Sequence, residues 1–366
     1  MSVSVIRIDN LRCIVHAEIK THPKFNLLYG LNGSGKTSAL EAIYLLGLAR
    51  SFRSSRIKRV IAEETEQCSV FAKLLDKNNQ EKTLGISKNN NGNTQIRLNR
   101  SPVKNASQLA RILPIQIITQ ESFSLIDGPS KPRKQLLDWL GFHVEHQFNN
   151  TWLTVQRLLK QRNALLRQLI DSPACRNEIA VWDNELSIQG EKLTVYRQNI
   201  FDEFKVNFQG VINKLLPHEN IELSFYQGWP VDKNLADVLC ASFERDVKLG
   251  YTQLSPNRAD LVIKSGKVPA SEKLSRGQKK LLVCAIILAQ VVTLNERDET
   301  DSRCIVLLDD LNAELDKDNQ RLLCNILNDC DAQVFITGTD SSALKEALPN
   351  NDCNMFHVEQ GSITPL

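Results

Sequence analysis

The sequence predicts an α/β fold that is interrupted by a helical lobe. Near the N-terminus, an apolar run at residues 25–29 precedes a glycine-rich loop and an amphipathic stretch at residues 38–48. Near the C-terminus, the apolar run at residues 305–308 ends in two aspartates. Between them, apolar residues recur at helical spacing over residues 148–170 and 178–216. The helical lobe is therefore expected to be inserted into a domain made from both ends of the chain.

The glycine-rich loop has the form G-x-x-x-x-G-K-T, which is the phosphate-binding loop motif. Its residues are Gly30, Leu31, Asn32, Gly33, Ser34, Gly35, Lys36 and Thr37, and Ser38 follows them. Glycines let the backbone turn so that successive N–H groups face one anion, and the following helix N-terminus adds partial positive charge. We expect Lys36 to reach the β- and γ-phosphates of ATP and Thr37 to hold Mg²⁺. The alternative is a glycine-rich turn without a ligand, but the spacing and both flanking elements disfavour it.

Length and composition set outer limits on the function. The 366 residues suit two domains, or one large domain with an insertion. A net charge of +3 is too small to indicate a nucleic-acid partner by itself. The nine cysteines occur without a C-x-x-C pair, so we expect no zinc site. We expect their thiols to be reduced, as in a cytoplasmic protein. No run approaches ~18 consecutive apolar residues, so no membrane span is expected.

Alternating apolar residues predict strands in the N-terminal part, at residues 5–8, 14–19, 69–75, 82–87 and 94–98. The Asn-rich segment 89–93 predicts a turn between the last two, which makes them antiparallel. Residues 113–119 form another apolar run, expected to be a buried strand.

A Gly-Pro break at residues 127–132 marks the start of the region predicted to be helical. After the two long helices, a strand is expected at residues 221–226 and a helix at 234–248. From Pro256 onward we expect strands at 261–263, 304–308, 334–337 and 355–358, with helices at 277–294 and 318–327. The expected division is an ATPase lobe from residues 1–130 and 255–366, and a helical lobe from residues 131–254.

The two carboxylates after the late apolar run are Asp309 and Asp310. A buried parallel strand ends at the sheet edge where ligands bind. We therefore expect Asp309 to lie beside the magnesium, and Asp310 to lie where a base can polarise the attacking water. An acidic turn after an ordinary core strand is the alternative, and the phosphate-binding loop in the same chain disfavours it.

Upstream of these carboxylates, Leu274 is followed by Ser275, Arg276, Gly277 and Gln278 at the start of a predicted helix. This segment resembles the L-S-G-G-Q signature of ABC-type ATPases, with Arg276 in place of the first glycine. In that superfamily, the signature binds the γ-phosphate of ATP held by a second subunit. Ser275 also suits an ordinary helix N-cap, which is the alternative interpretation.

Three more superfamily elements can be sought along the chain. Residues 311–316 are similar to the D-loop. Thr339 stands where many relatives carry a switch histidine that senses the γ-phosphate. We therefore take Thr339 as the candidate γ-phosphate contact at this position, although its side chain differs from histidine. The Q-loop glutamine is either Gln116 or Gln120.

Order, spacing and insertion together resemble the SMC-like ABC ATPases and, within them, the RecF family. Residues 35–53, the segment 121–139 and Pro256–Leu261 carry the closer resemblance. Asn257 and Gln120 depart from it, where His and Pro are expected. The resemblance implies an ABC-type ATPase head with an antiparallel β subdomain and an inserted helical lobe.

The resemblance also implies a function in DNA replication, recombinational repair and the SOS response. RecF-like proteins bind DNA and ATP, dimerise with ATP, hydrolyse it slowly and help RecO and RecR to load RecA at single-stranded gaps. We therefore expect a weak, DNA-stimulated ATPase that forms an ATP-dependent homodimer with Mg²⁺ and binds RecR.

Local basic density predicts contacts with the phosphates of duplex, gapped or junction DNA, and not sequence readout. Basic residues gather at 50–59, at 131–134 and along the first long helix, as Arg157, Lys160, Arg162 and Arg167. The predicted DNA contacts are Arg53, Arg56, Arg59 and Arg133, and the alternative is a solvated basic face.

The sequence disfavours three other functions. A small-molecule or nucleotide kinase has no use for the Ser275 signature. An ABC transporter subunit shares the motifs but has a much shorter helical insert, and a structural clamp of the SMC type needs longer coiled-coil arms.

Overall fold

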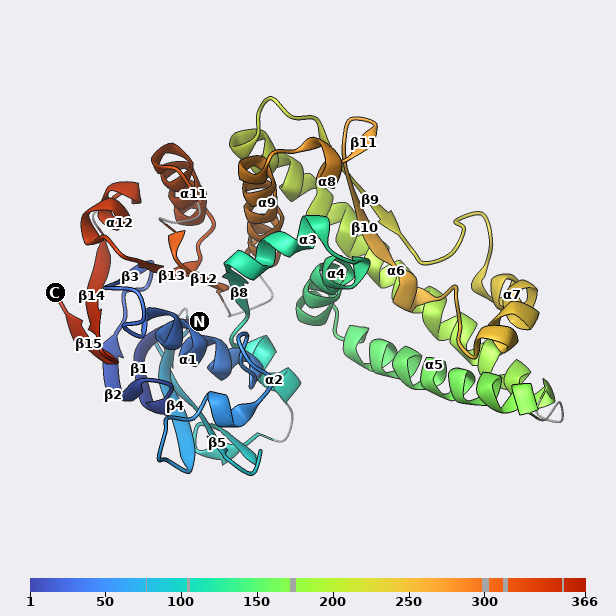
Figure 1. Cartoon of the computed structure of the whole chain (residues 1–366), viewed down its shortest axis with the longest axis horizontal. Coiled ribbons are helices and arrows are strands. Elements are labelled where there is room, and N and C mark those ends of the chain that lie inside the picture. Colours follow the sequence, from blue (N-terminus) through green and yellow to red (C-terminus); the bar gives the residue numbers. More distant parts are fainter. Residues whose placement is uncertain (77, 104–105, 172–175, 298–302, 312–314, 351) are drawn as a thin grey trace. The chain divides into compact units, whose positions relative to one another are not determined.

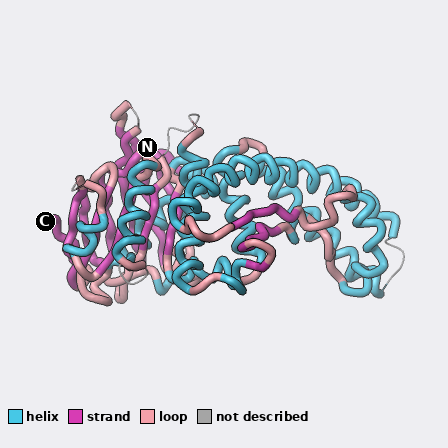
Figure 2. Tube along the Cα trace, turned by 90° about the horizontal axis from the view of Figure 1, so that it is seen from above, coloured by secondary structure: helices cyan, strands magenta, loops and turns pink. Residues whose placement is uncertain are grey.

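The structure, a computed structural model, describes residues 1–76, 78–103, 106–171, 176–297, 303–311, 315–350 and 352–366. It divides into two compact units (Figure 1). The sheet unit comprises Met1–Phe123, Gly210–Pro217 and Ser275–Leu366, and the helical unit comprises Ser124–Gln209 and His218–Leu274. Strands dominate the first unit and helices the second (Figure 2).

The sheet unit contains two six-stranded sheets. The first is antiparallel, with strand order β2-β1-β4-β5-β6-β7. Its strands are β1 (Ser2–Leu11), β2 (Ile14–Lys20), β4 (Gln67–Leu75), β5 (Glu81–Asn89), β6 (Thr94–Leu98) and β7 (Ser101–Pro102). Asn89 closes the predicted turn, because its side-chain oxygen accepts from the backbone N–H of Asn93 at 2.9 Å. The predicted antiparallel strands are thus confirmed.

The second sheet is parallel except at one edge, with strand order β15-β14-β3-β13-β12-β8 (Figure 1). Its strands are β3 (Phe25–Tyr29), β8 (Ile115–Ile118), β12 (Ile305–Leu308), β13 (Gln333–Gly338), β14 (Cys353–Glu359) and β15 (Ser362–Pro365). Every residue of β12 and β13 is buried, as expected for parallel strands covered on both faces. The strands that carry the loop and the carboxylates are therefore central and rigid.

Helix α1 (Lys36–Leu48) lies between the two sheets, since it contacts β1, β4 and β5 of the first and β8 and β13 of the second. Ten of its 13 residues are buried, including Leu40, Ile43 and Leu46. Side chains from both sheets and α1 form one core. The phosphate-binding loop is consequently attached to the best-packed part of the unit.

The remaining helices of the sheet unit are α2 (Ala106–Ile112), α9 (Arg276–Asn295), α11 (Lys317–Asp329) and α12 (Ser341–Ala347), with short turns η1 (Ile57–Arg59) and η2 (Gln120–Phe123). Helix α9 is the one described helix long and apolar enough to cross a bilayer. However, 72% of that stretch is buried inside the fold, which is the environment of a core helix.

The helical unit is built around two long antiparallel helices, α5 (Phe148–Asp171) and α6 (Arg176–Leu215). The last six residues of α6 are grouped with the sheet unit. Its other helices are α3 (Ser124–Asp127), α4 (Ser130–Val144), α7 (Leu235–Leu249) and α8 (Ala270–Lys273), with the turn η4 (Pro256–Arg258). Both long helices and α7 lie where the periodicity of apolar residues predicts them.

One boundary differs from the expected division. Strand β10 (Asp260–Ser265) pairs with β9 (Ile221–Tyr226) and β11 (Val268–Pro269) in a small antiparallel sheet. Because strand pairing joins residues 221–269, residues up to Leu274 belong to the helical unit, which also begins at Ser124 and not at residue 131. The sequence had placed residues 255–274 in the ATPase lobe, because an isolated apolar strand does not reveal its pairing partner.

Candidate functional site

The phosphate-binding loop runs from the end of β3 to the first residue of α1. Gly35 is the N-cap of α1 and has φ 115°, which L side chains rarely adopt. A Cβ at this position would also lie 2.9 Å from the Cys13 Sγ. Glycine at position 35 is therefore required by the backbone angle and by the close approach of the β1–β2 turn.

Lys36 folds back over this loop. Its Nζ donates to the carbonyl oxygens of Gly30 at 2.8 Å and Leu31 at 2.9 Å, and the residue is 7% exposed. Burial lowers the pKa of Lys36, whereas the charges of Asp310 and Asp309 act in the opposite direction. The ammonium group thus lies near both carboxylates, and its present acceptors are loop carbonyls that phosphate oxygens can replace.

Thr37 and Asp309 meet at the end of β12. The Thr37 Oγ1 donates to Asp309 Oδ1 at 2.9 Å, although the residues are 272 positions apart in sequence. A hydroxyl and a carboxylate are the oxygen ligands that Mg²⁺ prefers. The two residues predicted to hold the metal are therefore brought into contact by the fold.

A third residue, Thr337 at the end of β13, joins this pair. It is fully buried, and its Oγ1 donates to Asp309 Oδ1 and accepts from the backbone N–H of Asp310, both at 2.8 Å. The sequence analysis did not predict a role for Thr337. A hydroxyl near the end of an apolar strand, in a chain where another such strand ends in two aspartates, could have indicated one.

The signature segment lies at the N-terminus of α9. Ser275 is the N-cap and forms a capping box with Gln278: each side chain bonds to the other's backbone N–H, at 2.9 and 3.3 Å. Ser275, Arg276 and Gly277 are exposed, and a Cβ at Gly277 would meet open space. The N-cap interpretation is thus correct, and Ser275, Arg276 and Gly277 at this capped helix end are also exposed to solvent.

The remaining motif residues occupy the same sheet edge or lie outside the described residues. Thr339 is exposed one residue after β13, and the next residue, Asp340, caps α12. Gln116 lies within β8 and bonds to Gln290 of α9 at 3.2 Å, whereas Gln120 follows the strand end. Gln116 is thus held within the strand and Gln120 lies past it, and the Q-loop role of either glutamine stays a prediction. Residues 312–314 of the predicted D-loop lie outside the described residues.

Two further sets of contacts hold the loop and the helix that follows it. The N–H of Gly361, in the β14–β15 turn, donates to the Ser34 carbonyl oxygen at 2.8 Å. The buried Glu41 of α1 accepts two hydrogen bonds from Arg12 at 2.9 Å and another from Ser51. Both contacts join segments distant in sequence, so no local pattern predicts them.

The predicted DNA contacts divide into two groups. Arg53, Arg56 and Arg59 are exposed, and Arg53 lies with Arg50 and Lys88 at a cavity of ≈590 Å³. By contrast, Arg133 makes a bidentate ion pair with Asp260 at 2.9 Å, and Arg162 is fully buried against Asp183 and Asp246. Arg133 and Arg162 therefore have structural partners inside the helical unit, and their guanidinium groups are not directed to solvent.

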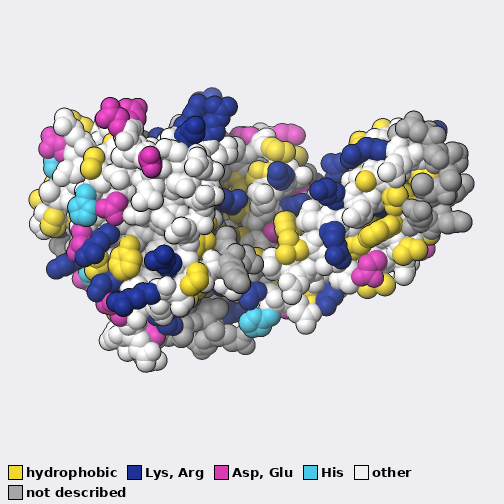
Figure 3. Space-filling model, turned by 90° about the horizontal axis from the view of Figure 1, so that it is seen from below, with side chains coloured by type: hydrophobic (Ala, Val, Ile, Leu, Met, Phe, Trp, Pro, Cys, Tyr) yellow, Lys and Arg dark blue, Asp and Glu magenta, His cyan; other side chains and the backbone are white. Residues whose placement is uncertain are grey.

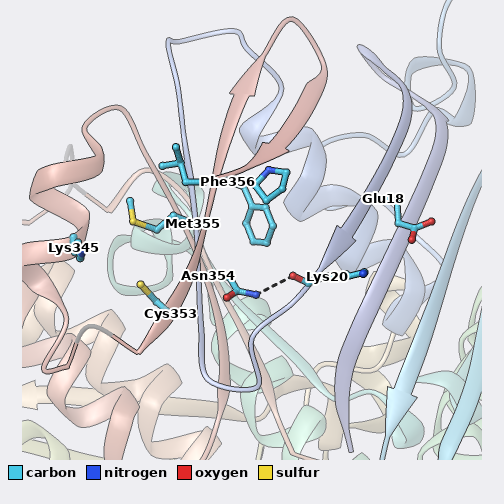
Figure 4. A pocket seen from close by; sticks show the side chains of 9 residues that line it. Glu18, Lys20, Lys345, Cys353, Asn354, Met355 and Phe356 are labelled. Carbon is cyan, nitrogen blue, oxygen red and sulfur yellow. Dashed lines mark hydrogen bonds between the residues drawn. The ribbon is translucent and has the colours of Figure 1, made fainter.

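A cavity of ≈720 Å³ lies elsewhere in the sheet unit (Figure 4). Residues Cys353–Phe356 of β14 line one side of it, and Glu18 and Lys20 of β2 the other. It contains none of the predicted site residues, so size alone does not identify the functional site of this chain.

Comparisons with known proteins agree on one family. The model of the RecF/RecN/SMC N-terminal domain matches residues 2–364. Proteins named DNA replication and repair protein RecF from Stutzerimonas stutzeri and Azotobacter vinelandii are each 42% identical, over 100% of the chain and 98% of the relative.

Solved structures share the fold. The recombination mediator protein RecF-ATP of the RecFOR pathway superposes with a TM-score of 0.86 at 24% identity, covering 100% of this chain and 97% of that one. An Smc head bound to the C-winged helix domain of ScpA gives 0.61 at 15% identity, covering 100% and 97%. The predicted fold class, an ABC-type ATPase head with an antiparallel β subdomain, is confirmed, and the chain belongs to the RecF family.

Proposed function

We propose that the chain is an ATP-dependent DNA-binding protein of recombinational repair, with further roles in replication and the SOS response. It dimerises on ATP, binds DNA at gaps and junctions, and acts with RecR and RecO to promote RecA loading in the cytoplasm. Slow, DNA-stimulated ATP hydrolysis then dissociates the dimer. The names of the 42% identical relatives support this assignment.

The observation that carries the proposal is the contact between Thr37 and Asp309 beside Lys36. In the proposed reaction, Gly30–Ser38 cradles the phosphates of ATP, and Thr37 and Asp309 hold Mg²⁺, which neutralises phosphate charge. Lys36 exchanges its loop carbonyls for phosphate oxygens. Asp310 accepts a proton from the attacking water, and Thr339 contacts the γ-phosphate.

A second copy completes the site in this proposal. The segment from Ser275 to Gln278, exposed as far as Gly277, presents a helix N-terminus, which favours an anion. If it binds the γ-phosphate held by another copy, two-fold symmetry buries two ATP molecules between two chains. ATP then stabilises the dimer and hydrolysis releases it.

DNA binding is assigned to exposed arginines of the sheet unit, Arg53, Arg56 and Arg59. In the helical unit, Arg157, Lys160 and Arg167 are exposed on α5 and form a separate candidate surface. Figure 3 shows groups of Lys and Arg side chains on one face of this unit. These residues contact phosphates, so binding is expected to depend on salt and hardly on sequence.

The shared-site model is tested by mixing two inactive variants. Lys36→Ala removes phosphate binding, and Ser275→Ala removes the signature hydroxyl. Each homodimer carries two defective sites, whereas a mixed dimer carries one intact and one doubly defective site. Light scattering with a slow ATP analogue and gapped DNA should show more dimer in the mixture than in either variant, with partial recovery of ATPase activity.

The double variant Lys36→Ala/Ser275→Ala mixed with wild type is the matched control, since its mixed dimer has only singly defective sites and its activity is compared with that of the wild type alone. Activity above the wild-type level in this control, without recovery in the first mixture, would rule out a site shared between copies. A wild-type chain that stays monomeric in all nucleotide states would contradict the proposed switch.

Salt titration tests the assigned DNA surface. Because each lost phosphate contact reduces the slope of log K against log[salt] by about 1, Arg56→Ala/Arg59→Ala should lower the slope by about 2. Arg7→Ala removes a charge from β1 and should leave the slope unchanged. Equal effects of both changes would indicate a general charge effect and no defined surface.

A further inference from the structure

We infer that Thr337 is a positioning residue that orients Asp309 and Asp310. The inference rests on the proposed function, because the acidic pair matters only in a chain that binds a metal–nucleotide complex. Neither the motif pattern nor the family resemblance assigns this residue a role.

The contacts of Thr337 define that role. A hydroxyl has one proton to donate and lone pairs to accept with, and Thr337 uses both. It donates to Asp309 Oδ1 and accepts from the Asp310 N–H, each at 2.8 Å, with the Leu308 carbonyl oxygen farther away at 3.5 Å. One side chain therefore fixes a carboxylate of the first aspartate and the backbone of the second.

The strand register explains why position 337 can do this. Strands β12 and β13 are parallel, with Leu308 opposite Ile336, so Thr337 lies beside the first residue after β12. The preceding residues of β13, from Val334 to Ile336, are apolar and buried. A buried hydroxyl among them is unfavourable unless it is hydrogen-bonded, and valine would fill the same volume. The hydroxyl is therefore explained by its two partners.

The backbone of Asp310 shows what the bond holds in place. Its φ is 55°, in the left-handed region that is uncommon for residues other than glycine. Such conformations persist only where surrounding contacts determine them, and they gather at functional sites. The N–H bond to Thr337 is one such contact, and it turns the chain directly at the proposed base.

Asp309 is the point where three elements converge. Its Oδ1 accepts from Thr37 of α1 and from Thr337 of β13, while Asp309 itself directly follows β12. Thr339 follows Thr337 by two residues on the same strand end.

Three variants isolate the hydroxyl. Thr337→Val keeps the volume and removes the hydroxyl, and Thr337→Ser keeps the hydroxyl and removes the methyl. Thr293→Val is the matched control, because Thr293 is also buried in the sheet unit and donates to the Ala289 carbonyl oxygen at 2.7 Å, away from the site. Thermal denaturation of each variant reports whether it is folded.

Three measurements then follow: Mn²⁺ binding in the presence of ATP by electron paramagnetic resonance, ATP turnover, and hydrogen exchange of the Asp310 amide in the free protein. In Thr337→Val, we expect Mn²⁺ affinity and kcat to fall about 10- to 100-fold, as for other supporting partners of metal ligands. KM should change less than about threefold, because the phosphate-binding loop is untouched. The Asp310 amide should exchange faster. Thr337→Ser and Thr293→Val should match the wild type.

Wild-type behaviour of Thr337→Val in Mn²⁺ binding and amide exchange would overturn the inference, as would a Thr337→Ser variant that is equally defective. A wild-type protein that fails to hold Mn²⁺ with ATP would instead overturn the proposed function. In that event, slower amide exchange in wild type than in Thr337→Val would still support the fixed turn at Asp310, and equal exchange would refute it.

Discussion

Glu41 shows how a single buried charge organises the segment around the phosphate-binding loop. It is fully buried in α1, and Arg12 of the β1–β2 turn bonds to both of its oxygens at 2.9 Å. Ser51 donates to the same carboxylate, and the Arg53 guanidinium lies 3.6 Å from it. The turn before the loop and the basic segment after α1 are thus tied to one residue.

Replacing Glu41 by Gln should destabilise the protein markedly, because the Arg12 charge loses its partner in a mostly buried place. Removing one member of a buried pair typically costs 3–5 kcal/mol, and we expect about 3 kcal/mol, since 19% of the Arg12 side chain is exposed. Urea denaturation measures this loss. Glu18→Gln breaks the exposed pair with Arg7 and should leave the midpoint unchanged; equal shifts in both variants would argue against the importance of burial.

The arginines show the limit of prediction at this scale. Arg157 and Arg162 are neighbours on one helix in sequence, yet the first is exposed and the second has no exposed surface. Arg162 bonds to Asp183 of α6, to Asp246 of α7 and to Thr252 just after α7. Composition identified a basic helix, but only its packing separated the exposed basic residues from the buried arginine with structural partners.

At the scale of elements, the β14–β15 hairpin supports the phosphate-binding loop. Its turn residue Gly361 has φ 82°, and the N–H of this residue donates to the Ser34 carbonyl oxygen at 2.8 Å. A Cβ on Gly361 would lie 2.0 Å from the Cys13 carbonyl oxygen. Three segments, from the start, the loop and the end of the chain, therefore meet with no room for a side chain.

Gly361→Ala should displace this turn and weaken nucleotide binding. Alanine is strained at this φ, and the backbone contact with Cys13 cannot yield as a flexible side chain would. We expect a lower melting temperature and an increase of about tenfold in the Kd for ATP, corresponding to ~1.4 kcal/mol. Calorimetry measures both quantities.

Gly210→Ala is the control for this change, since Gly210 lies in α6 with open space at its Cβ. Alanine in a helix interior should be neutral or stabilising by about 0.5–1 kcal/mol. Unaltered ATP binding by Gly361→Ala would mean that the hairpin contact does not shape the loop.

The element pattern was largely accessible from the sequence. Periodicity predicted α5, α6, α7 and α9 and most strands, because burial of one or two faces leaves a clear apolar repeat. Strand partners were less accessible: β10 was placed with the ATPase lobe, yet it pairs with β9 in the helical unit. Apolar alternation specifies that a residue is in a strand, whereas the neighbour depends on the path of the whole chain.

At the scale of the whole molecule, each unit has its own hydrophobic core. Five described cysteines are buried, all in the sheet unit and three of them within its strands and helices (Cys68, Cys284 and Cys324), whereas Cys13 and Cys240 are exposed. Burial raises the pKa of Cys68 to about 11 and those of Cys324 and Cys330 to about 12, from a reference of 9.0. These thiols therefore stay protonated in the folded protein at pH values where an unfolded chain would ionise them.

Stability should consequently fall as the pH rises above 9. In the folded state the Cys68 thiol keeps its proton up to about pH 11, whereas in the unfolded state it releases it from about pH 9, so high pH favours unfolding. Urea midpoints at pH 7.5 and pH 9.5 measure the loss. Cys68→Ala should show a smaller difference between the two pH values than the wild type, and the exposed-site variant Cys240→Ala the same difference; an unchanged difference in Cys68→Ala would contradict linkage to this thiol.

The sequence alone determined the fold class, the long helices and the residues of the phosphate-binding loop, the acidic pair and the signature. These follow from local spacing, because a short motif needs specific residue types at fixed intervals to bind phosphate or to start a helix. Only the tertiary structure decided which distant groups meet. Thr337 forms hydrogen bonds with Asp309 and Asp310, Gly361 with Ser34, and Arg12 with Glu41. Those contacts depend on strand order and packing, which bring together residues as far as 327 positions apart (Ser34 and Gly361), and no local pattern records them.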